Sequence, residues 1–142
     1  MIVIDASVAA KVYIEEAGSD EAIALLTGQQ KLLAPELIRV EVAAALLRRA
    51  RKGELVAAEA QRRCRHWLER LRLGLFRLTP DEELLDDAIA LAAELKHPLQ
   101  DCLYLAVARR ADVSLITADG KFRQRAHPFD SRIALLRGCE PN

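Results

Sequence analysis

Two short apolar runs, each followed closely by an aspartate, restrict the possible folds of this chain of 142 residues more than any other pattern. Ile2-Val3-Ile4 leads directly into Asp5, and residues 113–116 precede Asp119 by two residues. Runs of this length and apolar character are typical of strands buried in a parallel sheet. Functional groups in open α/β sheets collect at the carboxyl ends of the strands, which is where we expect Asp5 and Asp119.

The rest of the chain alternates between strand and helix patterns. We predict further strands at 31–34, 76–78 and 133–136, and helices from about Ser7, over 19–26, 35–51, 55–73 and 79–96, from Asp101 onward, and near Lys121. Pro35 suits the first turn of its helix, and Thr79-Pro80-Asp81-Glu82 predicts a capped helix start. This alternation indicates an α/β protein, with three α/β/α layers around a central, mainly parallel sheet.

Length and composition favour one domain over residues 1–142, with a helical, basic segment at about 54–73. A hydrophobic content of 51% argues against disorder. We expect a cytoplasmic protein that does not bind membranes, because no apolar run is long enough to span a bilayer and no basic leader precedes the first strand. Cys64, Cys102 and Cys139 lack C-x-x-C spacing and are odd in number, so we expect thiols and neither disulfides nor a zinc site.

Charge is unevenly distributed although the formal net charge is zero. Residues 39–77 are strongly basic and residues 81–94 are acidic. This asymmetry is compatible with a nucleic-acid-binding face and equally with ordinary solvated helix faces. The apolar face around Trp67, Leu68 and Leu71 fits either the protein core or a docking surface.

Two further acids, Glu41 and Asp101, lie in predicted helices beside apolar residues. Every residue three or four positions from Glu41 is apolar, and a buried carboxylate is costly unless it is paired, hydrogen-bonded or bound to a metal. Taken singly, the three aspartates could cap helices, and Glu41 could pair with a basic side chain from elsewhere in the protein. Four carboxylates that converge would repel one another, so together they indicate a site for a hard cation, Mg²⁺ or Mn²⁺.

Four segments of the chain resemble the motifs of PIN-domain ribonucleases, and within that family the VapC toxins of toxin-antitoxin pairs. They are Ile-Val-Ile-Asp-Ala-Ser-Val at 2–8, Glu-Val-Ala-Ala-Ala-Leu-Leu at 41–47, Asp-Cys-Leu-Tyr-Leu-Ala-Val-Ala at 101–108 and Leu-Ile-Thr-Ala-Asp-Gly-Lys-Phe at 115–122. The resemblance places Asp5, Glu41, Asp101 and Asp119 at the acidic positions of the family. Ser7 and Thr117 match its small hydroxylated positions beside the metal. Gln100 and Cys102 depart from the residues most common there, which affects the shape of the pocket rather than its ligands.

The resemblance also implies partners. Proteins of this kind act on RNA, usually form homodimers, and are held inactive by a cognate antitoxin whose C-terminal segment often places a basic side chain in the acidic pocket. The choice among RNA substrates does not follow from the sequence.

Phosphodiester hydrolysis needs an attacking hydroxide and neutralisation of the charge on the phosphate and the leaving oxygen. Two divalent cations about 3.5–4 Å apart can meet these needs. We assign Asp5 and Asp101 as principal ligands, Asp119 as a further ligand acting directly or through water, and Glu41 as a ligand or as the group that orients the attacking water. The expected products carry a 5′ phosphate and a 3′ hydroxyl.

Other functions fit the sequence less well. A metal-independent ribonuclease would use histidines, but His66, His97 and His127 lack ligand spacing and are expected at the surface or at helix ends. A dehalogenase-type phosphatase would need an acid at the position of Ser7, and a receiver domain would need adjacent acids near the first strand. A non-catalytic PIN-like module that binds RNA or protein is the main alternative.

Overall fold

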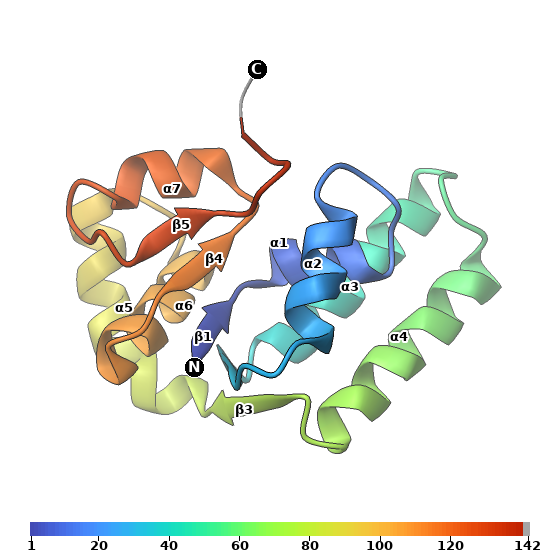
Figure 1. Ribbon diagram of the computed structural model, residues 1–142, viewed down its shortest axis with the longest axis horizontal. Helices are drawn as coiled ribbons and strands as arrows, with labels where there is room; N and C mark the ends of the chain where they lie inside the picture. The colour runs from blue at the N-terminus through green and yellow to red at the C-terminus, as the bar shows by residue number, and fades with distance from the viewer. Residues whose placement is uncertain (141–142) are drawn as a thin grey trace.

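The computed structural model describes residues 1–140 and contains one sheet of five parallel strands in that range (Figure 1). The strands are β1 (Ile2–Ile4), β2 (Leu32–Pro35), β3 (Phe76–Thr79), β4 (Leu115–Thr117) and β5 (Ile133–Leu135), in the spatial order β3-β2-β1-β4-β5. All neighbouring pairs are parallel. The predicted α/β class is confirmed, and the sheet is parallel throughout.

Helices cover both faces of this sheet. They are α1 (Ala6–Ala9), the 3₁₀ turn η1 (Ala10–Val12), α2 (Ser19–Thr27), α3 (Ile38–Arg51), α4 (Ala57–Arg72), α5 (Asp81–Leu95), α6 (Leu99–Ala111) and α7 (Gly120–Ala126). Right-handed crossovers between parallel strands place α1 to α4 on one face and α5 to α7 on the other. Figure 1 shows these two groups on either side of the strands. Within residues 1–140, no helix has the length and apolar character that crossing a bilayer requires.

The direction of the strand order reverses between β1 and β4. The chain passes from β1 outward through β2 to β3, then returns to β4 on the other side of β1 and ends at β5. The crossovers on either side of this point diverge to opposite faces, which leaves a crevice beyond the carboxyl ends of β1 and β4. Asp5 and Asp119 follow these two strand ends.

The apolar face of α4 belongs to the core. Trp67 is fully buried, its ring meets Phe76 edge-on at 5.9 Å, and its Nε1 donates a hydrogen bond to the carbonyl oxygen of Arg39 at 3.3 Å. Leu71 is also buried, and Leu68 packs against the core in part. The interpretation of this face as a docking surface is therefore wrong.

The predicted start of the helix at Pro35 and the predicted cap of α5 are also wrong. Pro35 pairs with Thr79 as the last residue of β2, and α3 begins at Ile38. A proline is tolerated there because β1 pairs only with Leu32 and Leu33, so no neighbour on that side needs a hydrogen bond from residue 35. Because Thr79 lies in β3, it does not cap α5; Asp81 instead accepts a hydrogen bond from the backbone N–H of Leu37 at 3.1 Å.

Candidate metal centre

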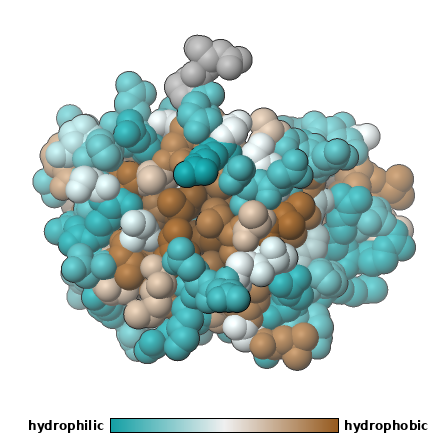
Figure 2. Space-filling model, in the orientation of Figure 1, coloured by the Kyte–Doolittle hydropathy of each residue, from teal (hydrophilic) through white to brown (hydrophobic). Residues whose placement is uncertain are grey.

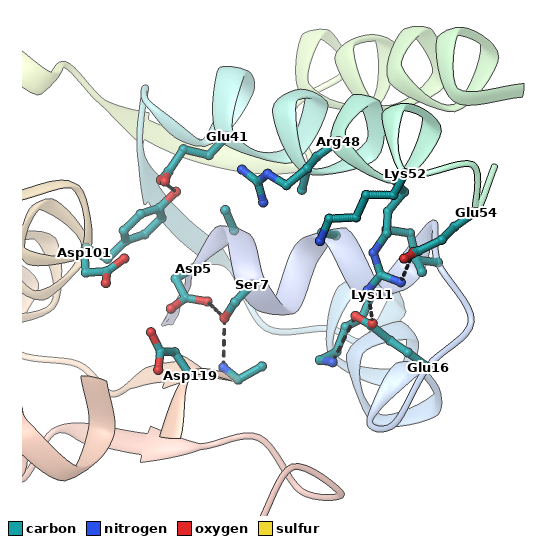
Figure 3. Close-up of a pocket in the computed structure, with 17 residues that line it drawn as sticks. Asp5, Ser7, Lys11, Glu16, Glu41, Arg48, Lys52, Glu54, Asp101 and Asp119 are labelled. Carbon is teal, nitrogen blue, oxygen red and sulfur yellow. Dashed lines mark hydrogen bonds and ion pairs between the residues drawn. The ribbon is translucent and has the colours of Figure 1, made fainter. Parts of the chain in front are cut away.

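The four acids singled out by the sequence line one cavity of about 690 Å³ at the carboxyl ends of the strands (Figure 3). Asp5 follows β1, Glu41 lies on α3, Asp101 on α6, and Asp119 follows β4. Figure 3 shows the three aspartate side chains turned toward a common space, with Glu41 beyond Asp101. The structure thus brings together residues separated by up to 114 positions, as the distance in sequence from Asp5 to Asp119 shows.

Asp5 and Asp119 each cap a helix as well as facing the cavity. Asp5 Oδ1 accepts a hydrogen bond from the Val8 N–H at 3.3 Å, and Asp119 Oδ1 accepts from the N–H groups of Lys121 and Phe122 at 2.9 and 3.2 Å. An aspartate can be both a helix cap and a metal ligand here, because capping fixes the orientation of the carboxylate. Asp101 is the third residue of α6 and does not cap it.

Ser7 and Thr117 connect the ends of β1 and β4. The Ser7 hydroxyl donates to Asp5 Oδ1 at 2.5 Å and accepts from the Ala118 N–H at 2.9 Å. Thr117 Oγ1 lies 3.4 Å from the Ser7 hydroxyl and accepts from the Asp119 N–H at 3.1 Å. The two hydroxyls therefore hold the loops that carry Asp5 and Asp119 in a fixed relation.

His97 is a site residue that sequence reasoning missed. Its Nε2 lies 2.6 Å from Asp101 Oδ2, its side chain is only 5% exposed, and its ring stacks on Phe122 at 4.6 Å. The expectation that His97 lies at the surface or serves only to end a helix is wrong. Its closeness in sequence to Asp101, four residues ahead, was the available signal, although His97 itself lies in the loop between α5 and α6. His66 is hydrogen-bonded to Tyr13, and His127 lies 3.2 Å from the carbonyl oxygen of Ile133. Among the described residues, neither belongs to the group that His97 forms with Asp101 and Asp119.

Tyr104 is the second missed residue, and it explains how Glu41 is tolerated. The Tyr104 hydroxyl donates to Glu41 Oε1 at 2.7 Å, and the ring is 1% exposed. Tyr104 lies three residues after Asp101, on the same side of α6. A buried phenol, rather than a basic side chain, is therefore the partner of Glu41.

Burial raises the pKa of three acids of this cavity, Asp5, Glu41 and Asp101. It raises the pKa of Asp5 to about 7, against the lowering effect of hydrogen bonds with Ser7 and Thr117. Burial also raises the pKa of Glu41, partly offset by Tyr104, and the pKa of Asp101, partly offset by His97. The charge on Asp101 raises the pKa of both Asp5 and Glu41, so the acids repel one another across the cavity. A bound cation would relieve this repulsion.

The donor atoms fit a hard divalent cation. One ligand atom each from His97, Asp101 and Asp119 lies within 4.8 Å of the other two. Asp5 and Glu41 line the same cavity as Asp101 and Asp119, whereas His97 lies behind Asp101 and does not line it. Carboxylate oxygens of this kind suit Mg²⁺ and Mn²⁺. The assignment of individual ligands stays a prediction.

Comparisons with known proteins agree with this architecture. A family model described as PIN domain matches residues 2–128. Ribonuclease VapC3 of Pyrobaculum aerophilum is 31% identical over 132 residues, which cover 93% of this chain and 97% of the relative. A solved structure of a toxin-antitoxin complex from Klebsiella pneumoniae superposes with a TM-score of 0.58 at 15% identity, covering 94% of this chain and 96% of the other. At that identity the superposition shows a shared fold.

Proposed function

Because this chain belongs to the PIN-domain family, we propose that it is a metal-dependent endoribonuclease that hydrolyses RNA phosphodiester bonds. The observation that carries the proposal is the convergence of Asp5, Glu41, Asp101 and Asp119 on one cavity. The 31% identity to a protein named ribonuclease VapC3 supports RNA as the substrate. A non-catalytic PIN-like module would have no physical reason to keep four mutually repelling acids together.

We assign the residues distinct roles. Asp5, Asp101 and Asp119 would hold the cation, and Glu41 would hold it or orient the attacking water. Ser7 and Thr117 position Asp5 and the loop before Asp119, and Tyr104 fixes Glu41. When bound, Mg²⁺ or Mn²⁺ lowers the pKa of the attacking water and offsets charge on the phosphate and leaving oxygens. The products would carry a 5′ phosphate and a 3′ hydroxyl.

We extend the proposal to a biological role as the toxin of a toxin-antitoxin pair. It rests on the name of the VapC3 relative and on the shared fold with a chain of the Klebsiella pneumoniae toxin-antitoxin complex. The partners would be a cognate antitoxin, whose basic side chain could neutralise the acidic cavity, and a second copy of the chain in a homodimer. Such an enzyme would act on RNA in the cytoplasm.

Asp5→Asn tests the catalytic proposal. Asparagine can still accept the Val8 hydrogen bond as a helix cap, so the fold should persist while a charged ligand is lost. We expect cleavage of total RNA with Mg²⁺ or Mn²⁺ to fall by about 10²–10³-fold, and EDTA to abolish it in the parent protein. Asp86→Asn, an exposed acid on α5 outside the cavity, is the control and should cleave normally. Unchanged cleavage by Asp5→Asn would overturn the assignment.

Titration calorimetry separates the enzyme from the binding-module alternative. The enzyme should bind Mg²⁺ or Mn²⁺ in the absence of RNA, and Asp101→Asn should weaken that binding. A PIN-like scaffold used only for binding RNA or protein should show no heat of cation binding in either form.

A further inference from the structure

The cavity has a basic end as well as an acidic end, and both lie along one face of α3. Glu41, Ala45, Arg48 and Lys52 follow one another at intervals of three or four residues, and all four line the cavity. Such spacing keeps residues on one side of a helix. Ala45 carries only a methyl group, so it leaves open space between Glu41 and the two cations. Figure 3 shows Arg48 and Lys52 extending from α3 over this space.

The cations at this end of the cavity differ in their partners. Glu16 pairs with both Lys11 and Arg49, and Glu54 pairs with Arg49. Among residues 1–140, neither Arg48 nor Lys52 has a carboxylate within 4.0 Å of its charged group. Both are exposed. Their charge is therefore available to an anion from outside the chain, at the mouth of a cavity that would otherwise repel one.

We propose that Arg48 and Lys52 bind phosphates of the RNA strand next to the phosphate that is cleaved, so that the strand runs along α3 from Glu41 toward Lys52. This inference rests on the proposed function. At a rise of about 1.5 Å per residue, the two residues lie about 6 Å apart along the helix axis, and Arg48 lies about 10 Å beyond Glu41. An extended strand with one phosphate among the acids can reach both. Guanidinium and ammonium groups bind phosphate oxygens whatever the base, so this end would set the path of the strand and not its sequence.

A simpler explanation is that basic residues stabilise the C-terminal end of α3, where the helix dipole is negative. Arg51 tests that explanation, because it lies in the same last turn, is exposed, and does not line the cavity. If the helix dipole were the whole reason for these cations, Arg48, Arg51 and Lys52 would be equivalent for RNA. If the cavity geometry decides, only Arg48 and Lys52 contribute to RNA binding and Arg51 does not.

The experiment measures binding of a fluorescently labelled single-stranded RNA of mixed sequence in EDTA, so that no metal-dependent cleavage interferes. Arg48→Gln and Lys52→Gln should each weaken binding about eightfold at about 50 mM salt, because each single-strand phosphate contact contributes a salt-dependence slope of about 0.7. The slope of log affinity against log salt should become shallower by about 0.7 in each variant and about 1.4 in the double variant. Arg51→Gln should match the parent protein.

A second readout is kinetic. With Mg²⁺ or Mn²⁺, Arg48→Gln and Lys52→Gln should raise KM with little change in kcat, because a phosphate contact away from the reacting atoms binds substrate and transition state alike. Equal slopes in the Arg48→Gln, Lys52→Gln and Arg51→Gln proteins would overturn the inference, even if the parent protein cleaves RNA. The salt-dependence slope could become shallower in the Arg48→Gln and Lys52→Gln proteins although the parent protein cleaves no RNA. That result would support the phosphate contacts and overturn the proposed nuclease activity.

Hydropathy alone does not mark such a path. Figure 2 shows hydrophobic side chains across the middle of the displayed face, with hydrophilic side chains around them.

Discussion

Tyr104 joins two of the four acids, because it follows Asp101 by three residues on α6 and donates to Glu41 on α3. His97, in the loop before α6, lies within hydrogen-bonding distance of Asp101. The four acidic positions were predictable from sequence, since each stands out against apolar neighbours. Their partners were not, because the contact between Tyr104 and Glu41 spans 63 residues and depends on how α3 and α6 pack.

Tyr104→Phe tests this connection. The change removes one hydroxyl from a ring that is otherwise buried, and leaves Glu41 Oε1 without its donor. We expect the free energy of unfolding to fall by about 1–2 kcal/mol. Since the hydrogen bond lowers the pKa of Glu41, its loss should raise that pKa further and move the acidic limb of the pH–activity profile to higher pH.

Tyr13→Phe is the matched control for this variant. It also removes a hydroxyl that is hydrogen-bonded, to His66 at 2.8 Å, but Tyr13 does not line the cavity. Its pH–activity profile should match that of the parent protein. An acidic limb that stays in place in Tyr104→Phe would show that Glu41 does not need to be ionised for cleavage.

The start of α3 is organised by α5, and this explains why its position was mispredicted. Proline suits both the first turn of a helix and the end of a strand, and only the pairing of Pro35 with Thr79 decides between them. That pairing joins residues 44 positions apart, as does the hydrogen bond from the Leu37 N–H to Asp81. The interiors of the helices follow from periodic patterns in the local sequence and were therefore predictable. These boundaries depend on tertiary contacts between distant segments and were not.

Asp81→Ala should therefore destabilise the start of α3, although Asp81 itself lies on α5. The Leu37 N–H loses its acceptor, which is equivalent to loss of a helix cap and should lower the free energy of unfolding by about 1 kcal/mol in urea denaturation. Glu82→Ala removes an exposed acid from the same first turn of α5, and so controls for the interaction of Asp81 with the dipole of its own helix. Equal losses in the two variants would mean that the contact with α3 contributes nothing.

The whole molecule places mutually repelling acids at the point where the strand order reverses. The alternation of strands and helices predicted a parallel sheet, and the apolar runs predicted which acids follow strands. The strand order β3-β2-β1-β4-β5 was not predicted, because crossover rules restrict handedness but allow several orders. It is this order that makes β1 and β4 neighbours and brings Asp5 near Asp119.

Stability of the molecule should therefore depend on pH and on cations together. The pKa of Asp5 is about 7 in the folded chain, raised mainly by burial from 3.8, so between about pH 4 and pH 7 the folded state holds more protons than the unfolded state. Under that condition the free energy of unfolding falls as pH rises. In EDTA the protein should lose stability across this range, and Asp5→Asn should lose less and be more stable than the parent by up to about 4 kcal/mol at pH 8, which is the free energy that a pKa difference of about 3 represents.

Cations should narrow this difference. At about 100 times its dissociation constant, Mg²⁺ or Mn²⁺ should add about 2.7 kcal/mol to the stability of the parent protein at pH 8, and much less to Asp5→Asn. Urea unfolding followed by fluorescence of Trp67, the single buried tryptophan, reports both effects. Burial of the charged acids is costly when no cation is present, so Mg²⁺ should stabilise the parent far more than it stabilises Asp5→Asn. A parent protein that is equally stable at pH 5 and pH 8 in EDTA, and indifferent to both ions, would contradict the coupling of the four acids through a metal.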